Sequence, residues 1–182
     1  MIFLAVVAAL VFALVAAYNK LVSLRQRSEE AWSDIDVQLK RRTDLVPNLV
    51  ETVRGYAAHE KTTLEQVIRA RGAAVAAQTP EARAQAENAL TGALRQLFAL
   101  AETYPQLRAN ESFQQLQASL AEIEGTIQDS RRYYNAVVRD FNTTIDSVPT
   151  NFIASFFRFA RRAYFELDRP EDRQVPRVSF GS

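Results

Sequence analysis

The chain has 182 residues, of which 48% are apolar and 24% charged, a composition typical of a folded protein. Its 22 basic and 21 acidic residues leave a net charge of +1, which gives no indication of nucleic-acid binding. The absence of cysteine excludes a disulfide scaffold, a thiolate metal site and a cysteine nucleophile. Only five glycines and six prolines interrupt the chain, which favours an all-α fold built from long helices.

The first seventeen residues have no polar side chain and predict a membrane-spanning helix. At about 1.5 Å per residue they span about 25 Å, near the lower limit for a bilayer, and continuation to residue 24 completes the span. Residues 1–24 are therefore the predicted transmembrane anchor. A cleaved signal peptide is the alternative, because Val15 and Ala17 suit the −3 and −1 positions of a cleavage site.

The basic residues that flank the apolar run indicate its orientation. Lys20, Arg25 and Arg27 follow the run, and no basic residue precedes it. A secretory signal normally begins with a basic segment, so this order favours an anchor. The positive-inside rule then predicts a single-pass protein whose helical domain lies on the cytoplasmic side.

Small side chains recur every four residues along the anchor, at Ala5, Ala9, Ala13 and Ala17. Such a stripe lets two backbones approach closely, and this packing is a principal source of helix association in lipid. The stripe predicts self-association of the anchor. The alternative is that alanine is simply common in this chain.

Residues 25–167 predict an elongated, antiparallel, coiled-coil-like bundle of about four helical segments. The first continues from the anchor to about residue 77, with Pro47 marking either a bend or a break. The second begins at the capping sequence Thr79, Pro80 and Glu81 and runs to about residue 102.

The third predicted helix is capped by Asn110, and its apolar residues alternate at spacings of three and four over more than four heptads. A helix of this length spans about 50 Å and requires the first helix as its antiparallel partner. The last predicted helix covers residues 149–167. The tail at 168–182 is charged and contains proline, so we expect it to be loosely ordered.

Aromatic residues surround most of the last predicted helix, so it must be buried on more than one side. The bundle core, a neighbouring subunit and the membrane surface are three possible coverings. The residues expected at a subunit or lipid contact are Phe152, Phe156, Phe157, Phe159, Arg158, Arg161 and Arg162.

Acidic residues on the first helix predict two kinds of ion pair. Asp44 with Arg41, and Glu51 with Arg54, stand three residues apart, which indicates ordinary surface pairing. A carboxylate buried between helices needs a cationic partner, for which Arg131 or Arg132 is a candidate. The candidates for polar pairing between helices are Asp34, Asp36, Asp44, Glu51, Arg131 and Arg132.

Residues 30–42 read EAWSDIDVQLKRR, residues 55–60 read GYAAHE, and residues 131–135 read RRYYN. These runs resemble the LemA family of bacterial membrane proteins, and the resemblance extends from the anchor to about Glu166. It implies an elongated helical bundle anchored in the bacterial inner membrane. It brings no accepted catalytic residue.

No arrangement of residues predicts catalysis, a cofactor or a metal site. His59 is the only histidine, and no nucleophile motif or phosphate-binding loop accompanies it. We therefore expect a non-enzymatic membrane scaffold that self-assembles, whose partners are the lipid bilayer and further copies of itself. The alternatives are a membrane-remodelling or lipid-binding protein, and an adaptor or regulator of another membrane protein such as a protease.

Overall fold

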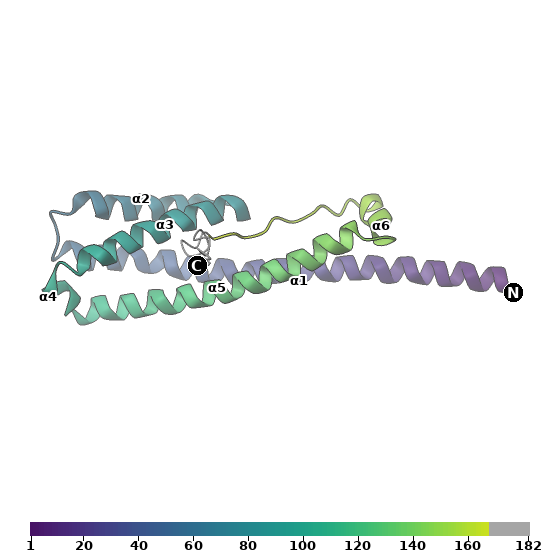
Figure 1. The fold of residues 1–182 in the computed structure, drawn as a ribbon, viewed down its shortest axis with the longest axis horizontal. Helices are drawn as coiled ribbons and strands as arrows, with labels where there is room; N and C mark the ends of the chain where they lie inside the picture. The colour runs from purple at the N-terminus through teal and green to yellow at the C-terminus, as the bar shows by residue number, and fades with distance from the viewer. Residues whose placement is uncertain (168–182) are drawn as a thin grey trace, which may run out of the picture.

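A computed structural model describes residues 1–167, which form six helices and no strand (Figure 1). The predicted tail at 168–182 lies outside the described residues. The helices are α1 (Ile2–Arg54), α2 (Lys61–Ala76), α3 (Pro80–Ala101), α4 (Pro105–Arg108), α5 (Glu111–Asp146) and α6 (Thr150–Phe156). The all-α prediction, with a long apolar helix at the N-terminus, is confirmed.

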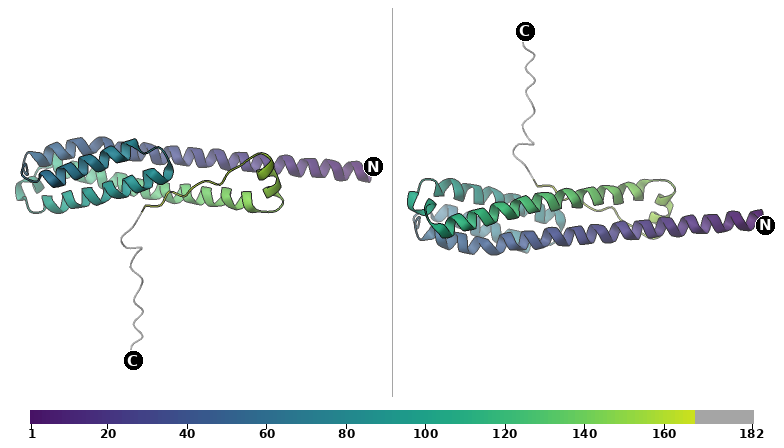
Figure 2. Two further views of the ribbon diagram at one scale, coloured as in Figure 1. Left: turned by 90° about the horizontal axis from the view of Figure 1, so that it is seen from above. Right: turned by 90° about the horizontal axis from the view of Figure 1, so that it is seen from below.

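The helices form a long rod (Figures 1 and 2). α1 runs its whole length, and the N-terminal part of α1 projects alone beyond the other helices. α5 lies antiparallel to α1, as the heptad pattern predicted, while α2 and α3 cover the end of the rod that is distant from the N-terminus. The distal half is therefore a four-helix bundle. In the proximal half, α1 and α5 pack with α6 and with the chain that follows it.

α1 continues through Pro47 without a break. Proline has no backbone N–H, so the carbonyl of Thr43 loses the donor that normally follows four residues later. Arg71 of α2 replaces it, because its Nε–H donates to the Thr43 oxygen at 2.8 Å. The prediction of one helix to residue 77 is wrong, since α1 ends at Arg54 and the chain reverses. The reversal lets α2 bury apolar side chains such as Val67 in the bundle core.

The two predicted helix starts are confirmed. The Thr79 side chain accepts a hydrogen bond from the N–H of Ala82 at 3.2 Å, with Pro80 in the first helical position. The Asn110 side chain likewise accepts from the N–H of Phe113 at 2.9 Å. Both caps satisfy backbone donors that the first turn of a helix leaves without a partner.

The predicted helix over residues 149–167 is wrong beyond Phe156, where α6 ends. Arg158 has a φ of 57°, in the left-handed region. The N–H of Phe159 donates to the oxygen of Ala154 at 2.9 Å, and the N–H of Arg158 donates to Ser155 at 3.2 Å. This pair of bonds is the Schellman helix terminator. Glycine is the usual residue at this position. Because arginine occupies it here, the sequence pattern gives no signal that the helix ends.

Replacing Arg158 with glycine is expected to stabilise the protein by about 1 kcal/mol, because glycine adopts the left-handed conformation without steric cost. The melting temperature of the full chain in detergent should rise by about 2–4 °C. Arg161→Gly is the control, since it also removes an arginine from this segment but at a residue without positive φ. Equal destabilisation by both substitutions would contradict the prediction.

Candidate functional site

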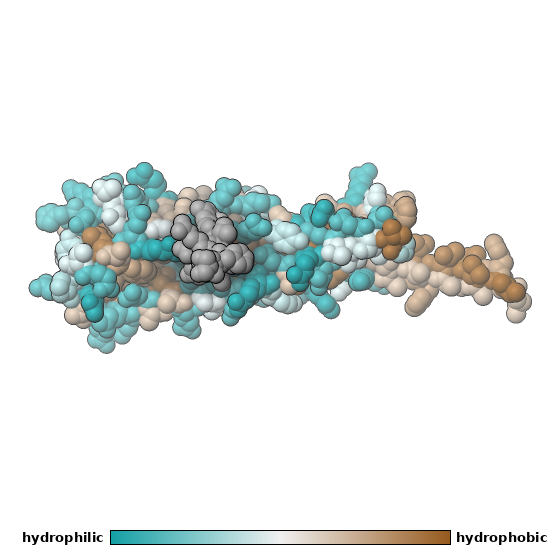
Figure 3. Space-filling view, viewed as in Figure 1, coloured by the Kyte–Doolittle hydropathy of each residue, from teal (hydrophilic) through white to brown (hydrophobic). Residues whose placement is uncertain are grey.

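The N-terminal third of α1 is an exposed apolar surface. α1 contains a segment long and apolar enough to cross a membrane, and none of that segment is buried in the molecule. It is the projecting hydrophobic end in Figure 3. An apolar surface of this extent is rarely left in water. The structure therefore agrees with the predicted anchor.

α6 packs against α1 where the anchor enters the bundle. Its buried residues Ile153 and Ala154 join Leu21 and Phe141 in a small core cluster. Beside this cluster, the ring of Tyr18 lies 4.7 Å from that of Phe157, measured between centroids. The end of the anchor is thus held by contacts with the C-terminal part of the described chain.

Beside these contacts, an apolar groove with a volume of about 470 Å³ lies between α6 and the anchor. Its lining residues are Leu14, Val15, Tyr18, Phe152, Ile153, Phe156 and Phe157. Phe152 and Phe156 are 70% and 80% exposed. α6 therefore contributes one face to the bundle core and leaves its phenylalanines facing outward.

The other predicted contact residues lie just after α6. Arg158 and Arg161 are exposed, whereas Phe159 and Arg162 are half-buried. Arg25 lies over the ring of Phe159, 5.5 Å from its centroid. Arg161 and Arg162 form ion pairs with Asp146 at 3.4 Å and with Glu29 at 2.5 Å, respectively.

Residues 157–167, called the strap below, run back along the rod without helical structure. Asn142 donates to the oxygen of Arg162 and accepts from its N–H, both at 2.9 Å. Asn135 does the same with Phe165, at 3.0 and 2.9 Å. Asn135 and Asn142 are seven residues apart on α5, and their partners Phe165 and Arg162 are three residues apart on the extended strap. Both separations span about 10 Å, so each asparagine lies beside its partner.

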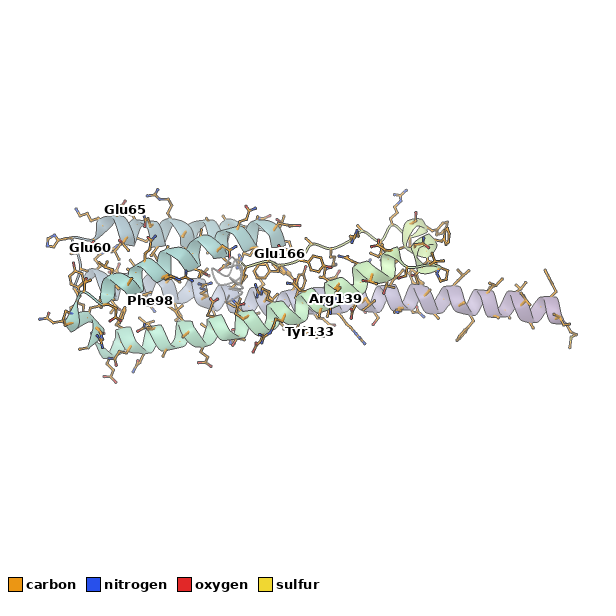
Figure 4. All side chains as sticks on the ribbon, in the orientation of Figure 1. Glu60, Glu65, Phe98, Tyr133, Arg139 and Glu166 are labelled. Atoms are coloured by element: carbon orange, nitrogen blue, oxygen red, sulfur yellow. The ribbon has the colours of Figure 1, made fainter. Side chains whose placement is uncertain are left out.

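The strap ends in the core at mid-rod. Phe165 is fully buried, and its ring lies 5.4 Å from that of Trp32 between centroids. The Tyr134 hydroxyl donates to the oxygen of Ala163, and Arg131 donates to that of Leu167. Figure 4 labels Glu166, on the strap, near the middle of the rod. The strap thus takes the place that a further helix would fill.

A buried charge network joins α1, α3 and α5 within the distal four-helix bundle. Arg42 of α1 lies 3.3 Å from both Glu87 of α3 and Glu124 of α5, and donates to the Thr91 hydroxyl at 2.8 Å. Arg83 lies 3.6 Å from Glu87. The Glu87 side chain is fully buried, and those of Arg42 and Arg83 are 4% and 9% exposed.

Burial raises the pKa of Glu87 above its ordinary value of 4.5, because the charged carboxylate is desolvated. The guanidinium groups of Arg42 and Arg83 act in the opposite direction, and the carboxylates of Glu124 and Asp36 raise the pKa further. The network therefore contains a carboxyl whose charge depends on three helices packing together.

The predicted polar residues have varied partners. Asp36 pairs between helices, but with Arg83 of α3 at 3.3 Å rather than with Arg131 or Arg132. Glu51 pairs with Arg54 at 2.5 Å as expected, whereas Asp44 pairs with Lys40 at 2.7 Å rather than with Arg41. Arg132 pairs with Asp129 within α5, Arg131 contacts the strap, and Asp34 is exposed on α1.

Sequence reasoning missed the buried network itself. Arg42 falls between Leu39 and Val46 on the core-facing stripe of α1, and Glu87 precedes Leu90 on that of α3. A charge within an apolar stripe was the available signal.

His59 is exposed in the distal loop, next to Glu60, which Figure 4 labels at the distal end. Within residues 1–167, no three side chains of the metal-binding types gather into a cation site. The notable features are instead the anchor, the groove, the strap and the buried network.

Together these features define a membrane-associated helical bundle. The chain belongs to the LemA family, whose model matches residues 31–180. Magnetosome protein MamQ 2 of Paramagnetospirillum magneticum is 25% identical over 88% of this chain and 68% of its own length. Protein LemA of Metamycoplasma hominis is 26% identical, over 88% of this chain and 74% of its own length.

Proposed function

We propose that the protein is a non-enzymatic membrane scaffold that self-assembles and holds a rigid rod outside the bilayer. The observation that carries the proposal is the uninterrupted helix α1, which joins the anchor to the distal end of the bundle. From residue 24 to Arg54, α1 extends about 45 Å at 1.5 Å per residue. The helical domain is proposed to lie on the cytoplasmic side of a bacterial inner membrane.

Continuous packing along the rod supports a mechanical role. Three core clusters follow one another along α1, centred on Leu49, Ile35 and Leu21. Close-packed cores resist deformation, so a tilt of the anchor would be transmitted to the distal end. Such a rod can set a distance between the membrane and another component.

Self-assembly requires surfaces that the bundle itself does not use. The apolar stripe of α5 packs against α1 within the chain, so it is occupied. Ala5, Ala9 and Ala13 of the anchor are exposed, and Ala17 is half-buried beside α6. The small-residue stripe supports association between anchors.

We expect the full chain in mild detergent to form a discrete oligomer, measured by light scattering corrected for bound detergent. The double substitution Ala9→Leu and Ala13→Leu should lower the molar mass, because larger side chains keep the backbones apart. Ala8→Leu is the control, since it adds a leucine side chain to the anchor off the stripe. A monomeric wild-type chain would contradict self-assembly and would favour the adaptor alternative.

A further inference from the structure

We infer that the groove between α6 and the anchor holds an acyl chain of a membrane phospholipid, with the exposed phenylalanines of α6 inserted in the same leaflet. The inference requires the anchor to span the membrane, and it is independent of self-assembly.

The depth of the groove follows from its lining. Leu14 and Val15 belong to the apolar segment that is able to cross a membrane. Side chains that share a groove with these two residues lie at their depth in the bilayer. Phe152 and Phe156 share it and point away from the protein core. They are therefore placed where hydrocarbon, not water, surrounds the anchor.

The backbone of α6 suits this position. Unpaired carbonyl groups are costly in lipid, and a short helix normally leaves its last ones without donors. Here the Schellman bonds satisfy the oxygens of Ala154 and Ser155, and the N–H of Phe157 donates to Ile153 at 2.9 Å. The carbonyls of Ile153, Ala154 and Ser155 thus have donors without water.

Charge and aromatic placement agree with a leaflet boundary. Tyr18 lines the groove two residues before Lys20, as expected where an anchor passes from hydrocarbon to headgroups. Arg158 and Arg161 are exposed just beyond the groove-lining Phe157. Cations beside an inserted apolar helix favour anionic headgroups.

An acyl chain fits the groove better than a second copy of the protein. The volume of about 470 Å³ lies within the range of small-ligand sites, about 300–1,000 Å³. A stable protein interface needs about 20–30 residues on each side, whereas seven residues line this groove. A bilayer surrounds the anchor at this depth and supplies acyl chains at high local concentration.

The first test is quenching of a tryptophan reporter by brominated acyl chains. Full-length Trp32→Phe protein carrying Phe156→Trp is reconstituted into vesicles of phosphatidylcholine and phosphatidylglycerol, at high lipid excess. Bromination should quench it to the same extent as Leu10→Trp in the anchor, while Val75→Trp on α2 keeps its fluorescence. The inference would be overturned if bromination changes the fluorescence of Phe156→Trp as little as it changes that of Val75→Trp. This holds even if a blue-shifted emission shows that the protein buries the indole.

A second measurement avoids any change at Trp32. The chain has no cysteine, so Phe152→Cys accepts a single nitroxide label. In the same vesicles the label should collide more with oxygen, which concentrates in hydrocarbon, than with an aqueous nickel chelate. The reverse order, matching a label at Val75→Cys, would overturn the inference.

Discussion

Replacing Glu87 with alanine is expected to lower the free energy of unfolding by about 3–5 kcal/mol. The substitution removes the acceptor to which the buried Arg42 donates and leaves a cavity beside Arg42 and Arg83, which together cost far more than the loss of an exposed pair. The melting temperature of the full chain in detergent should fall by about 6–20 °C.

Asp44→Ala is the matched control for this substitution. Asp44 pairs with Lys40 at 2.7 Å, but both side chains are more than half exposed. Exposed pairs of this kind contribute less than about 1 kcal/mol. Equal losses for Glu87→Ala and Asp44→Ala would show that burial of the network has no energetic consequence.

The same carboxyl predicts a dependence of stability on pH. Burial raises the pKa of Glu87 in the folded protein above its ordinary value of 4.5. Its contribution to stability is therefore fully present below about pH 4.5 and is lost as pH rises through its folded-state pKa. The difference in unfolding free energy between wild type and Glu87→Gln should decrease over this window. A difference that increases with pH would contradict the prediction.

Removing both strap asparagines, by Asn135→Ala and Asn142→Ala, is expected to release residues 157–167 from the rod. Each asparagine both donates to and accepts from the strap backbone, and a buried polar group left without its partner costs about 1–3 kcal/mol. Hydrogen exchange at the Arg162 and Phe165 amides should accelerate by about 100-fold or more.

Trp32 gives an independent measurement of strap release. It is the only tryptophan, and its ring lies against that of Phe165. Departure of the strap should expose the indole and shift its emission to longer wavelength. Asn48→Ala removes an exposed asparagine from α1 and is the control. Unchanged exchange and emission in the double variant would mean that apolar packing alone holds the strap.

Local signals in the sequence were enough to predict most of the helical framework. Thr79 and Asn110 cap the helices that follow them, because a side-chain oxygen next to a first turn acts within three residues. The heptads of α5 predicted its antiparallel pairing with α1, and the apolar run predicted the exposed end of α1.

The α1 boundary was harder to predict. Pro47 left a bend and a break open, and the donor that preserves the helix comes from Arg71, twenty-eight positions after Thr43. The turn after Arg54 likewise depends on the apolar side chains that α2 buries when it folds back along α1. Neither effect is visible in the residues near the boundary.

The candidate sites depended most on tertiary structure. Arg42 and Glu87 are forty-five positions apart, so their pairing exists only once α1 and α3 pack. Arg158 ends α6 without the usual glycine, and asparagines on another helix hold the strap beyond it. Patterns along the chain determined most of the helical segments and their apolar faces, because these depend on near neighbours. The partners of buried charges and the path of the strap were decided by contacts between distant residues.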